Sequence, residues 1–358
     1  MVLQIIIIAF GITCVLIPLA RVFGWEDIPG GRKDHNGNIP LVGGIAIFLT
    51  ILTGTYLLDI TPYTPAVLLV TLIPFIVGVI DDKVHISPTL RLAIHFGSGV
   101  LLATWGGIVI SQVGNLLGFG DIPLLLLAIP LTALAAAGLC NAYNMIDGID
   151  GLAAATMAIP LSTLTLLAYE AQHPAAPAVL LILLPVLVFL CFNLQLIPRL
   201  PKIFLGDGGS VTLGFLITAS LVYFSQGPQA AIQPVTALWL VTLPLMDMLA
   251  TMLRRVKHGL HPMEADKSHL HHIIQRMGLN NRETFAVLVT YAVACSLIGL
   301  ALEDSETYIS LIAYILLFAG HCLFVMQAFR ISRFVRKHSG KPEVSERTIN
   351  WIRTNKPK

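Results

Sequence analysis

Charged residues are scarce in this sequence. Lysine, arginine, aspartate and glutamate together make up 12% of its 358 residues, which is about half of their usual share in a soluble domain. No long soluble insertion separates the apolar parts of the chain. The shortage of charge therefore excludes an ordinary soluble globular protein and predicts one continuous membrane domain.

Cysteine is also rare, and its placement excludes two kinds of site. All five cysteines lie in or at the ends of apolar runs, and no Cys-x-x-Cys pair occurs. We therefore expect neither disulfide bonds nor a thiolate metal site. The first apolar run lacks both a preceding basic residue and a small-residue cleavage site, so it predicts a retained span rather than a signal peptide.

Long apolar runs make up much of the sequence. Hydrophobic residues make up 56% of the chain, and the mean hydropathy is +0.81. Runs of roughly 17 to 21 residues can each cross about 30 Å of hydrocarbon. They predict an all-α, polytopic integral membrane protein with about eleven transmembrane helices, at 2–20, 41–58, 64–80, 90–110, 122–140, 152–169, 177–197, 211–224, 234–253, 285–302 and 308–328. Because run 211–224 is short, ten spans with one re-entrant segment is the alternative.

Lysine and arginine are missing from every second loop. All 22 of them lie in one set of alternate loops or at the span ends beside it, whereas the other set carries acidic residues alone. The positive-inside rule places the basic set in the cytoplasm, the N-terminus outside and the C-terminus inside. The basic loops are 21–40, 81–89, 141–151, 198–210, 254–284 and the segment from 329.

Five polar clusters interrupt the apolar background, and all five belong to the basic set of loops. The first is Gly30–Gly44, in which glycines such as Gly43 and Gly44 let a ligand approach the backbone. Its basic side chains can meet phosphate, and they are Arg32, Lys33 and His35. An ordinary basic loop is the alternative.

Two further clusters carry carboxylates. Asp81 and Asp82 are adjacent, with Arg91 just inside the next span. Neighbouring carboxylates repel each other and seldom persist beside a membrane without a cation or a role, so they predict divalent-metal or substrate-phosphate chemistry. Asp207 lies among glycines where a span begins, and there it can hold a metal that bridges to phosphate. A solvated turn and a capped turn are the respective alternatives.

The fourth cluster repeats with a period of three. Asn141, Asn144, Asp147 and Asp150 fall near one face if the preceding helix continues through them. Four oxygen-bearing side chains suit Mg²⁺, a hard cation that takes oxygen ligands. A capped polar helix end is the alternative.

The fifth cluster, in loop 254–284, is rich in histidine and basic residues. Its candidate site residues are Arg255, Lys267, His269, His271 and His272. Histidine is a common zinc ligand, but no closed tetrahedral set is visible, and phosphate binding agrees better with the oxygen-rich clusters. A solvated basic loop is the alternative. The remaining polar residues in or near spans are interpreted as satisfied packing residues, namely His95, Asp247 and His321.

Together the clusters predict a single site at the cytoplasmic membrane surface. Carboxylates and amides for a cation, with basic groups for phosphates, are the requirements of phosphoryl transfer, which depends on positioning and charge neutralisation. The membrane setting suggests that one reactant is a lipid. A transporter is the main alternative, but no clear repeat is found and the polar clusters lie at one surface. A non-catalytic scaffold would not need five such clusters.

At these motifs the chain resembles the polyprenyl-phosphate N-acetylhexosamine-1-phosphate transferase family. The matching stretches are Ile-Pro-Leu-Val-Gly-Gly at 39–44, Asp81-Asp82, the run 141–151, Phe-Leu-Gly-Asp-Gly-Gly-Ser at 204–210 and Ser-His-Leu-His-His at 268–272. The resemblance covers about residues 20–330. It is nearest to the bacterial branch that acts on undecaprenyl phosphate, through Pro-Val-Thr-Ala-Leu-Trp at 234–239 and Pro-Leu-Met-Asp at 244–247, although Gly208 stands where alanine is usual.

The resemblance implies a reaction and its participants. N-acetylglucosamine 1-phosphate would pass from UDP-N-acetylglucosamine to undecaprenyl phosphate, with release of UMP and with Mg²⁺ or Mn²⁺ as cofactor. The lipid-linked pyrophosphate sugar would start O-antigen, enterobacterial common antigen or a related glycan. We expect a bacterial inner membrane protein with a transmembrane catalytic domain (1–328), a basic cytoplasmic tail (329–358) and no nucleic-acid partner. A homodimer is left open.

The family's chemistry also suggests roles for the candidate residues. Asp207 is the first candidate metal ligand, supported by Asn144, and Asp81 and Asp82 either bind metal too or position the lipid phosphate. Asp147 and Asp150 are expected to orient groups around the metal and nucleotide. The remaining candidates are expected to bind or neutralise phosphate, and they are Gly43, Gly44, Arg91, Asn141, Arg255, Lys267, His269, His271 and His272. Since a phosphate monoester is largely dianionic near neutral pH, no strong general base is needed.

Overall fold

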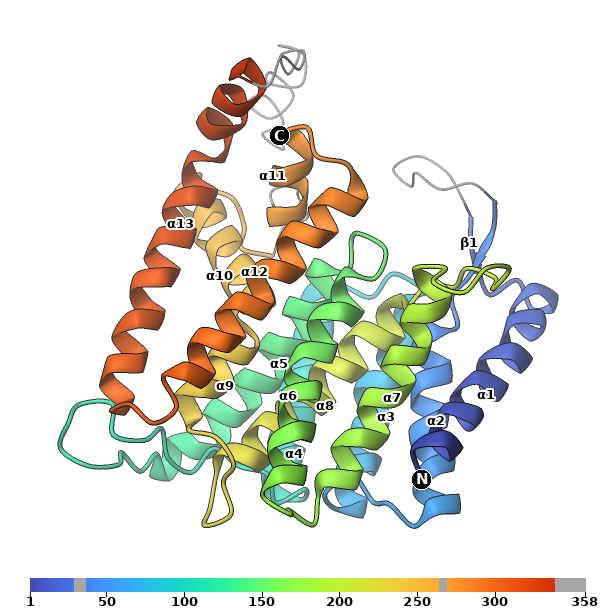
Figure 1. Ribbon diagram of the computed structural model, residues 1–358, viewed down its shortest axis with the longest axis horizontal. Helices are drawn as coiled ribbons and strands as arrows, with labels where there is room; N and C mark the ends of the chain where they lie inside the picture. Colours follow the sequence, from blue (N-terminus) through green and yellow to red (C-terminus); the bar gives the residue numbers. More distant parts are fainter. Residues whose placement is uncertain (29–36, 264–268, 339–358) are drawn as a thin grey trace.

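The computed structural model describes residues 1–28, 37–263 and 269–338, and helices dominate it (Figure 1). The helices are α1 (Val2–Val22), α2 (Gly43–Leu58), α3 (Pro65–Asp81), α4 (Pro88–Thr104), α5 (Ala128–Ile146), α6 (Leu152–Glu170), α7 (Ala176–Asn193), α8 (Gly206–Ser225), α9 (Pro234–Leu240), α10 (Thr242–Lys257), α11 (Leu270–Arg276), α12 (Asn281–Ala301) and α13 (Thr307–His338). A 3₁₀ turn at Leu125–Leu127 precedes α5, and β1 (Glu26–Asp27) pairs antiparallel with β2 (Ile39–Pro40). The all-α prediction is confirmed.

The described residues contain fewer full-length membrane spans than the sequence predicts. Seven helices are long and apolar enough to cross a bilayer, and the number rises to eight if the bent pair α9–α10 counts as one span. Helices α2 and α3 are apolar but shorter, and α4 has 17 residues. The polytopic architecture is therefore confirmed, whereas these helices alone do not establish the count of eleven.

The short run 211–224 belongs to a longer helix than its hydropathy suggests. Helix α8 begins five residues earlier, at Gly206, and has 20 residues, so the alternative of a re-entrant segment here is wrong. The break lies instead between α9 and α10, which are bent by 81°. Proline has no N–H to donate, so Pro244 cannot bond to the carbonyl of Leu240 and continue α9.

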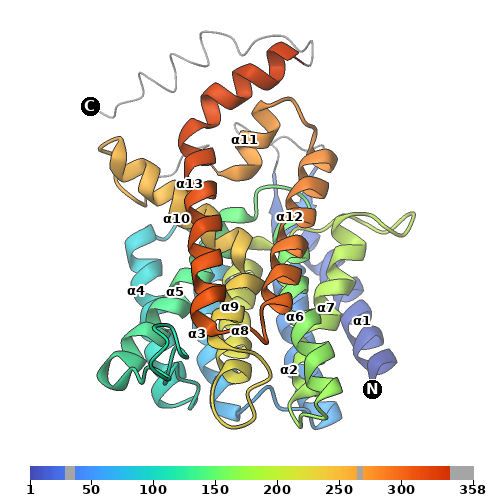
Figure 2. The same ribbon diagram turned by 60° about the vertical axis from the view of Figure 1, so that its left-hand side comes forward.

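Helix α8 lies at the centre of the bundle. It packs against α2, α3, α5 and α6, and 94% of its apolar window is buried, compared with 22% for both α1 and α13. A helix that is apolar on every face is expected to be enclosed by others. This arrangement, visible from two directions in Figures 1 and 2, places the first turn of α8 in the middle of one end of the bundle.

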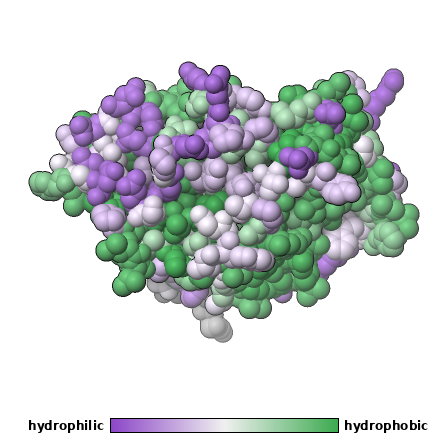
Figure 3. Space-filling model, turned by 90° about the horizontal axis from the view of Figure 1, so that it is seen from below, coloured by the Kyte–Doolittle hydropathy of each residue, from purple (hydrophilic) through white to green (hydrophobic). Residues whose placement is uncertain are grey.

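The loops gather at two ends of the bundle, in the two sets expected from the charge pattern. In Figure 1 the upper end carries β1, α11 and the end of α13, while the N-terminus lies toward the lower end. The lower loops contact one another, since Ser111 donates to Gln226 and Gln233 donates to Glu303. Figure 3 shows this lower end, where hydrophilic side chains gather over part of a largely apolar surface.

The expected boundary between residues 328 and 329 falls inside a helix. Helix α13 continues from Thr307 to His338 without interruption, so the first part of the predicted tail extends the last span. Basic residues occupy its final turn, where a helix terminus favours positive charge.

Candidate active site

Close contacts between glycines bring α2, α3 and α8 together at the upper end of the bundle. A Cβ atom at Gly44 would lie 2.2 Å from the backbone nitrogen of Gly209, and one at Gly78 would lie 2.7 Å from the carbonyl oxygen of Asp207. Contacts this short leave no room for any side chain. The first turn of α8 is therefore held directly against the backbones of α2 and α3.

Gly43 and Gly44 pack closely against the segment that leads into α8. Their N–H groups donate to the carbonyl oxygens of Phe204 and Leu205, both at 2.9 Å, so these donors are already used within the protein. The backbone N–H groups of both glycines are therefore engaged within the protein, and a contact with ligand stays a prediction. The basic residues of the same cluster, Arg32, Lys33 and His35, lie outside the described residues.

Asp82 caps the helix that carries Asp207. Its Oδ1 accepts from the backbone N–H of Asp207 at 2.7 Å, and its Oδ2 accepts from that of Gly208 at 3.2 Å. The first N–H groups of a helix have no partner within the helix, and a carboxylate is favoured there by the helix dipole. Gly206, with φ of +74°, allows this approach, since a Cβ atom there would lie 2.7 Å from Asp82 Oδ2.

Asn144 and Arg91 hold the carboxylate of Asp207 from two sides. Asn144 donates from Nδ2 to Asp207 Oδ1 at 2.7 Å and to the hydroxyl of Ser210 at 3.2 Å. Arg91 Nη1 lies 3.5 Å from Asp207 Oδ2 and forms an ion pair with Asp81. Asp81 in turn accepts from the backbone N–H of Ile86 at 2.7 Å. Arg91 is therefore engaged by carboxylates rather than left open for phosphate.

The stripe with a period of three does not form one helical face, and that prediction is wrong. Helix α5 ends at Ile146, and Asp147 has ψ of 56°, outside the helical range. Two glycines explain the break, because Gly148 follows immediately and Gly151 has φ of +73°, a conformation that glycine adopts most readily. The chain turns here before α6 begins.

The four residues of that stripe consequently face different neighbours. Asn144 contacts Asp207, whereas Asn141 is buried with its amide nitrogen 3.1 Å from the sulfur of Met145 and 3.5 Å from that of Met248. Asp150 forms an ion pair with Lys202 at 2.5 Å. Asn141 and Asp150 thus have protein partners other than Asp207.

Negative charge exceeds positive charge around the start of α8. Within the described residues, no lysine or arginine forms an ion pair with Asp82 or Asp147. Burial and the charge of Asp207 raise the pKa of Asp82 to about 7, against the two backbone donors that lower it. Desolvation by the surrounding protein, followed by the charges of Asp207, Asp82 and Asp150, also raises the pKa of Asp147. A cation would relieve this repulsion.

The donor set agrees in chemistry with Mg²⁺ or Mn²⁺. Carboxylate and amide oxygens are the ligands that such hard cations take, and Asp207, Asp82, Asp81 and Asn144 supply them. No group of three or more histidine, cysteine, aspartate or glutamate residues in the described part of the chain is arranged to hold a metal ion as it stands. The agreement between these residues and a metal ion therefore depends on the chemistry of the donors and on their uncompensated negative charge. A bound ion would have to replace hydrogen bonds made by Asp82 and Asn144.

The histidine cluster is anchored by Asp247 of α10. Its Oδ2 lies 2.9 Å from His269 Nδ1, and its Oδ1 accepts from the backbone N–H of Leu270 at 2.7 Å. Asp247 therefore caps α11 and fixes the orientation of His269. The interpretation of Asp247 as a satisfied residue is confirmed, and the ring of His269 is parallel to that of His271, with centroids 6.0 Å apart.

His271 connects α11 to the turn that carries Asp147. A Cβ atom at Gly148 would lie 2.5 Å from His271 Nε2, so the imidazole rests on this glycine. Burial, followed by the charge of His272, lowers the pKa of His271 to about 3. It is consequently neutral near pH 7 in the free protein and can donate or accept a hydrogen bond, and its role toward phosphate stays a prediction.

The other basic candidates of this loop make different contacts. Arg255 is buried and donates from Nη1 to the carbonyl oxygen of Pro262 at 2.7 Å. His272 lies beside Gln275, with Nδ1 at 3.4 Å from the side-chain oxygen. Lys267 lies outside the described residues.

Comparison with known proteins identifies the family of this chain. The sequence model described as Glycosyl transferase family 4 matches residues 64–225, a range that contains Asp81, Asp82, Asn144, Asp147 and Asp207. An undecaprenyl-phosphate alpha-N-acetylglucosaminyl 1-phosphate transferase of Escherichia coli (strain K12) is 31% identical over 324 residues, which cover 89% of this chain and 88% of that protein. The chain belongs to glycosyl transferase family 4.

Two further relatives extend the similarity. A protein of the same name from Haemophilus influenzae is 34% identical over 338 residues, covering 92% of this chain and 94% of the relative. Another from Salmonella typhi is 31% identical over 337 residues, covering 92% of both chains. The alignments span nearly the whole chain, and the family resemblance inferred from the motifs is confirmed.

Sequence reasoning missed two residues of this family member that support the site. Lys202 pairs with Asp150 and lies over the ring of Phe204, 5.3 Å from its centroid. Ser210 accepts from Asn144. A usable signal for Lys202 was its place five residues before Asp207, in a loop with few other charges. Ser210 ends the matching stretch 204–210, but its residue type alone indicated no role.

Two histidines within helices differ from their interpretation as satisfied packing residues. In the described part of the chain, the Nε2 atoms of His95 and His321 are buried and have no hydrogen-bond partner. His321 approaches a partner only through Nδ1, which lies 3.5 Å from the hydroxyl of Tyr291.

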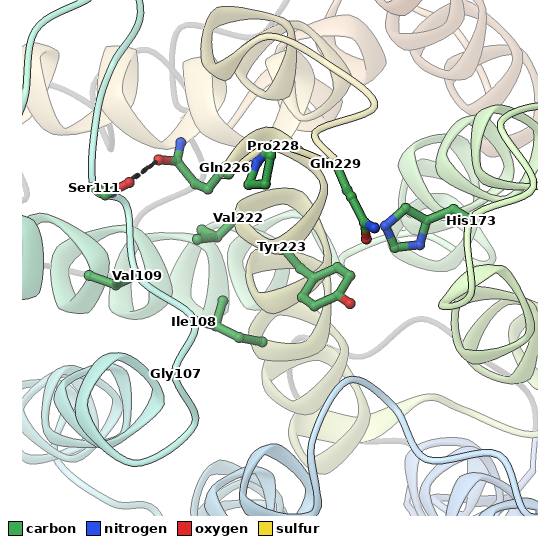
Figure 4. Close-up of a pocket in the computed structure, with 11 residues that line it drawn as sticks. Gly107, Ile108, Val109, Ser111, His173, Val222, Tyr223, Gln226, Pro228 and Gln229 are labelled. Carbon is green, nitrogen blue, oxygen red and sulfur yellow. Dashed lines mark hydrogen bonds between the residues drawn. The ribbon is translucent and has the colours of Figure 1, made fainter.

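A cavity of about 360 Å³ lies at the opposite end of the bundle (Figure 4). It is lined by the end of α8, including Val222 and Tyr223, and by the loop after α4, where Ser111 donates to Gln226 at 2.9 Å. It contains none of the predicted site residues. The concentration of carboxylates at the start of α8 therefore identifies the candidate active site of this family member better than the cavity does.

Proposed function

We propose that this member of glycosyl transferase family 4 transfers N-acetylglucosamine 1-phosphate from UDP-N-acetylglucosamine to undecaprenyl phosphate. The observation that carries the proposal is the group of aspartates around the start of α8, at one end of an apolar helical bundle. Comparison supports the proposal, because 89% of the chain is similar to a protein that is named for this activity. The product would be a lipid-linked pyrophosphate sugar that starts O-antigen, enterobacterial common antigen or a related surface glycan.

The reaction is a displacement at phosphorus. An oxygen of the lipid phosphate attacks the sugar-bearing phosphorus, and a new phosphorus–oxygen bond forms. The bond from that phosphorus to the bridging oxygen breaks, and UMP leaves with the bridging oxygen and its electron pair. Because the lipid phosphate is largely dianionic near pH 7, no proton has to be removed before attack. Catalysis then depends on positioning the reactants and stabilising negative charge.

The residues around α8 can perform these two tasks. When bound, Mg²⁺ or Mn²⁺ supplies positive charge to the phosphate oxygens, and Asp207 is the first candidate to hold it, with Asp81, Asp82 and Asn144. Asn144 fixes the orientation of the Asp207 carboxylate, while Asp82 fixes the first turn of α8. Neutral His271, on the turn beside Asp147, can donate a hydrogen bond to an anionic group.

The orientation in the membrane is part of the proposal. The proposal that this end lies in the cytoplasm of a bacterial inner membrane is supported by the charge pattern, because all 22 lysines and arginines belong to the basic set of loops or the span ends beside it. The N-terminus would then lie outside and the C-terminus inside, with each of the eleven predicted runs crossing the bilayer. The active site would face the cytoplasm, where nucleotide sugars are made.

A purified-protein assay tests this function. The full chain in lipid nanodiscs is given UDP-N-acetylglucosamine with and without undecaprenyl phosphate, and UMP and the lipid product are measured by mass spectrometry. UMP release that requires both the acceptor and Mg²⁺ is expected, and the Asp207→Asn variant serves as the matched control. A parallel panel with UDP-N-acetylgalactosamine and UDP-glucose identifies the preferred sugar. Preference for another sugar would change the donor, whereas no acceptor-dependent UMP release from any donor would refute the reaction.

A further inference from the structure

Arg91 joins two aspartates that belong to different helices. It lies in the first turn of α4, where its Nη1 forms an ion pair with Asp81 at the end of α3 and lies 3.5 Å from Asp207 Oδ2 on α8. Its side chain is 17% exposed, and that of Asp81 is 4% exposed. The guanidinium of Arg91 therefore lies between the carboxylates of Asp81 and Asp207 and is largely buried.

The two oxygens of Asp207 have different neighbours. Oδ1 accepts from the Asn144 amide, a neutral donor, whereas Oδ2 faces the positive charge of Arg91. The two oxygens of Asp82 are used by backbone N–H groups, and the nearby cation Lys202 is paired with Asp150. Within the part of the chain that the structure describes, Arg91 is thus the side chain that pairs its positive charge with Asp207 and Asp81.

We infer that Arg91 is an internal counter-ion which a divalent cation must displace from Asp207. The inference rests on the proposed function in taking Asp207 as the principal ligand and a UDP-sugar as the substrate. Two positive charges a few ångströms apart repel each other strongly where solvent screening is weak. The guanidinium must therefore move away or weaken the affinity of Asp207 for the ion, so that cation binding to the substrate-free protein is weaker than the carboxylates alone would make it.

The released guanidinium has an appropriate second partner. Its planar set of N–H donors matches the oxygens of a phosphate group, and the substrate carries a pyrophosphate. A UDP-sugar that binds Arg91 would free Asp207 for the ion, and by linkage the ion would favour binding of the UDP-sugar. Arg91 is in this sense a positioning residue that couples the occupancy of the cation to that of the nucleotide.

Removing the charge of Arg91 should change cation affinity in opposite directions for a counter-ion role and for a purely structural role. If Arg91 only fastened the turn between α3 and α4 through Asp81, its removal would loosen the carboxylates and weaken cation binding. If it is a counter-ion, its removal adds net negative charge at Asp207 and strengthens cation binding. The sign of the change in affinity therefore separates the two roles without any measurement of turnover.

The experiment measures binding of Mn²⁺ to the substrate-free full-length protein in detergent, by the electron paramagnetic resonance signal of the free ion. The proteins compared are the wild type, Arg91→Gln, Arg91→Lys and the control Arg21→Gln. Arg21 is 60% exposed and lies 4.0 Å from Glu26, away from α8. We expect Arg91→Gln to bind Mn²⁺ at least about tenfold more tightly, which corresponds to about 1.4 kcal/mol. Arg91→Lys, which keeps the charge, and Arg21→Gln should stay near the wild-type affinity.

Adding UDP-N-acetylglucosamine without a lipid acceptor tests the coupling. The ligand should tighten Mn²⁺ binding more in the wild type than in Arg91→Gln, because the variant has no guanidinium to release. If Arg91→Gln does not elute as a single species in gel filtration, Arg91→Met replaces it, since methionine preserves the apolar stem.

Equal or weaker Mn²⁺ affinity in the folded charge-removing variant would overturn the inference. An absence of Mn²⁺ binding to every variant would overturn it as well. Acceptor-dependent UMP release by the wild type remains a separate measurement, so the proposed reaction can stand when this inference fails.

Discussion

Asp82 and Asp207 are joined by a hydrogen bond of 2.7 Å from the backbone N–H of one to the side-chain carboxylate of the other. They are 125 residues apart in the chain. Because the bond ends on the helix backbone, Asp82 controls the position of α8 while the side chain of Asp207 remains available for other partners. Substitutions of Asp82 should consequently affect the stability of α8, whereas substitutions of Asp207 should affect the charge of the site.

Asp207→Asn should reduce activity more than Asp150→Asn. Asparagine keeps an oxygen but loses the charge that offsets a cation, and loss of such a charge-stabilising group commonly costs about 10² to 10³ in rate. Asp150 is paired with Lys202 outside the capped turn, so its loss should be milder. The measurement is UMP release across a Mg²⁺ series, with folding checked by gel filtration. Near-wild-type activity of Asp207→Asn at low Mg²⁺ would transfer the role of principal ligand to Asp81 and Asp82.

Asp82→Ala should destabilise the protein more than Asp82→Asn. Alanine leaves the N–H groups of Asp207 and Gly208 without their acceptor, and loss of a helix N-cap costs about 1 kcal/mol. Asparagine still accepts a hydrogen bond and should retain most of the thermal stability, although it removes the charge. Thermal unfolding in detergent of the two variants provides the comparison. Equal melting temperatures for both variants would argue against the capping role.

Gly44→Ala should disrupt the junction of α2 and α8. The new Cβ atom would lie 2.2 Å from the backbone nitrogen of Gly209, and overpacking of this kind commonly costs about 1 to 3 kcal/mol. Gly138→Ala is the matched control, because no atom lies within 4 Å of a Cβ atom there. The control should be neutral or slightly stabilised, since alanine favours helix by about 1 kcal/mol. Thermal unfolding checks both variants, and similar losses in the two would contradict the packing argument.

His271→Ala and His272→Ala should lower turnover while the protein still inserts normally, since both positions lie on α11 outside the apolar spans. His258→Ala, at an exposed position, is the control. Tightly bound stoichiometric zinc in the purified protein would instead favour a metal site at these histidines.

The effect of His271→Ala should not vary between pH 5.5 and 8.5. The pKa of His271 is lowered to about 3, so the imidazole gains a proton only well below this range and is neutral throughout it. The ratio of kcat/KM between wild type and variant, which reports the free enzyme, should therefore stay constant with pH. A ratio that grows as the pH falls through 7 would show that the charged imidazolium is the active form.

Single-cysteine labelling should place Lys83 and Gln229 on opposite sides of the membrane. Both positions are exposed, and they lie in loops of the two different sets. With the five native cysteines replaced, Gln229→Cys should react with an impermeant reagent in intact cells, whereas Lys83→Cys should react only after permeabilisation. Labelling of Lys83→Cys in intact cells would reverse the proposed orientation.

Most of the helices were predictable from the sequence, because local composition determines where a membrane helix forms. Apolar length alone identifies membrane helices, because a lipid-embedded backbone must satisfy its own hydrogen bonds. Apolar length missed the polar first turn of α8, which lies outside the apolar run. The three-residue spacing at 141–150 was misleading for another reason, because the helix ends at Ile146 before Gly148 and Gly151. The charge pattern also separated the loops into the two ends that the structure shows.

The site was predictable in its residue types but not in its contacts. Asp82 meets Asp207 because Gly78 and Gly208 allow α3 and α8 to touch, and no local pattern reveals a contact across 125 residues. The same holds for His271 on Gly148. Arg91 was expected to bind phosphate, whereas in the structure its guanidinium forms ion pairs with Asp81 and Asp207.

The central place of α8 also orders the events of biosynthesis. Chains are made from the N-terminus, so α2, α3 and α5 emerge before the helix that must pack among them. Until α8 has been synthesised, Asp82 has no helix terminus to cap. A nascent chain that stops short of α8 would therefore contain most of the proposed acidic residues, yet it could not assemble the centre that they form in the finished protein.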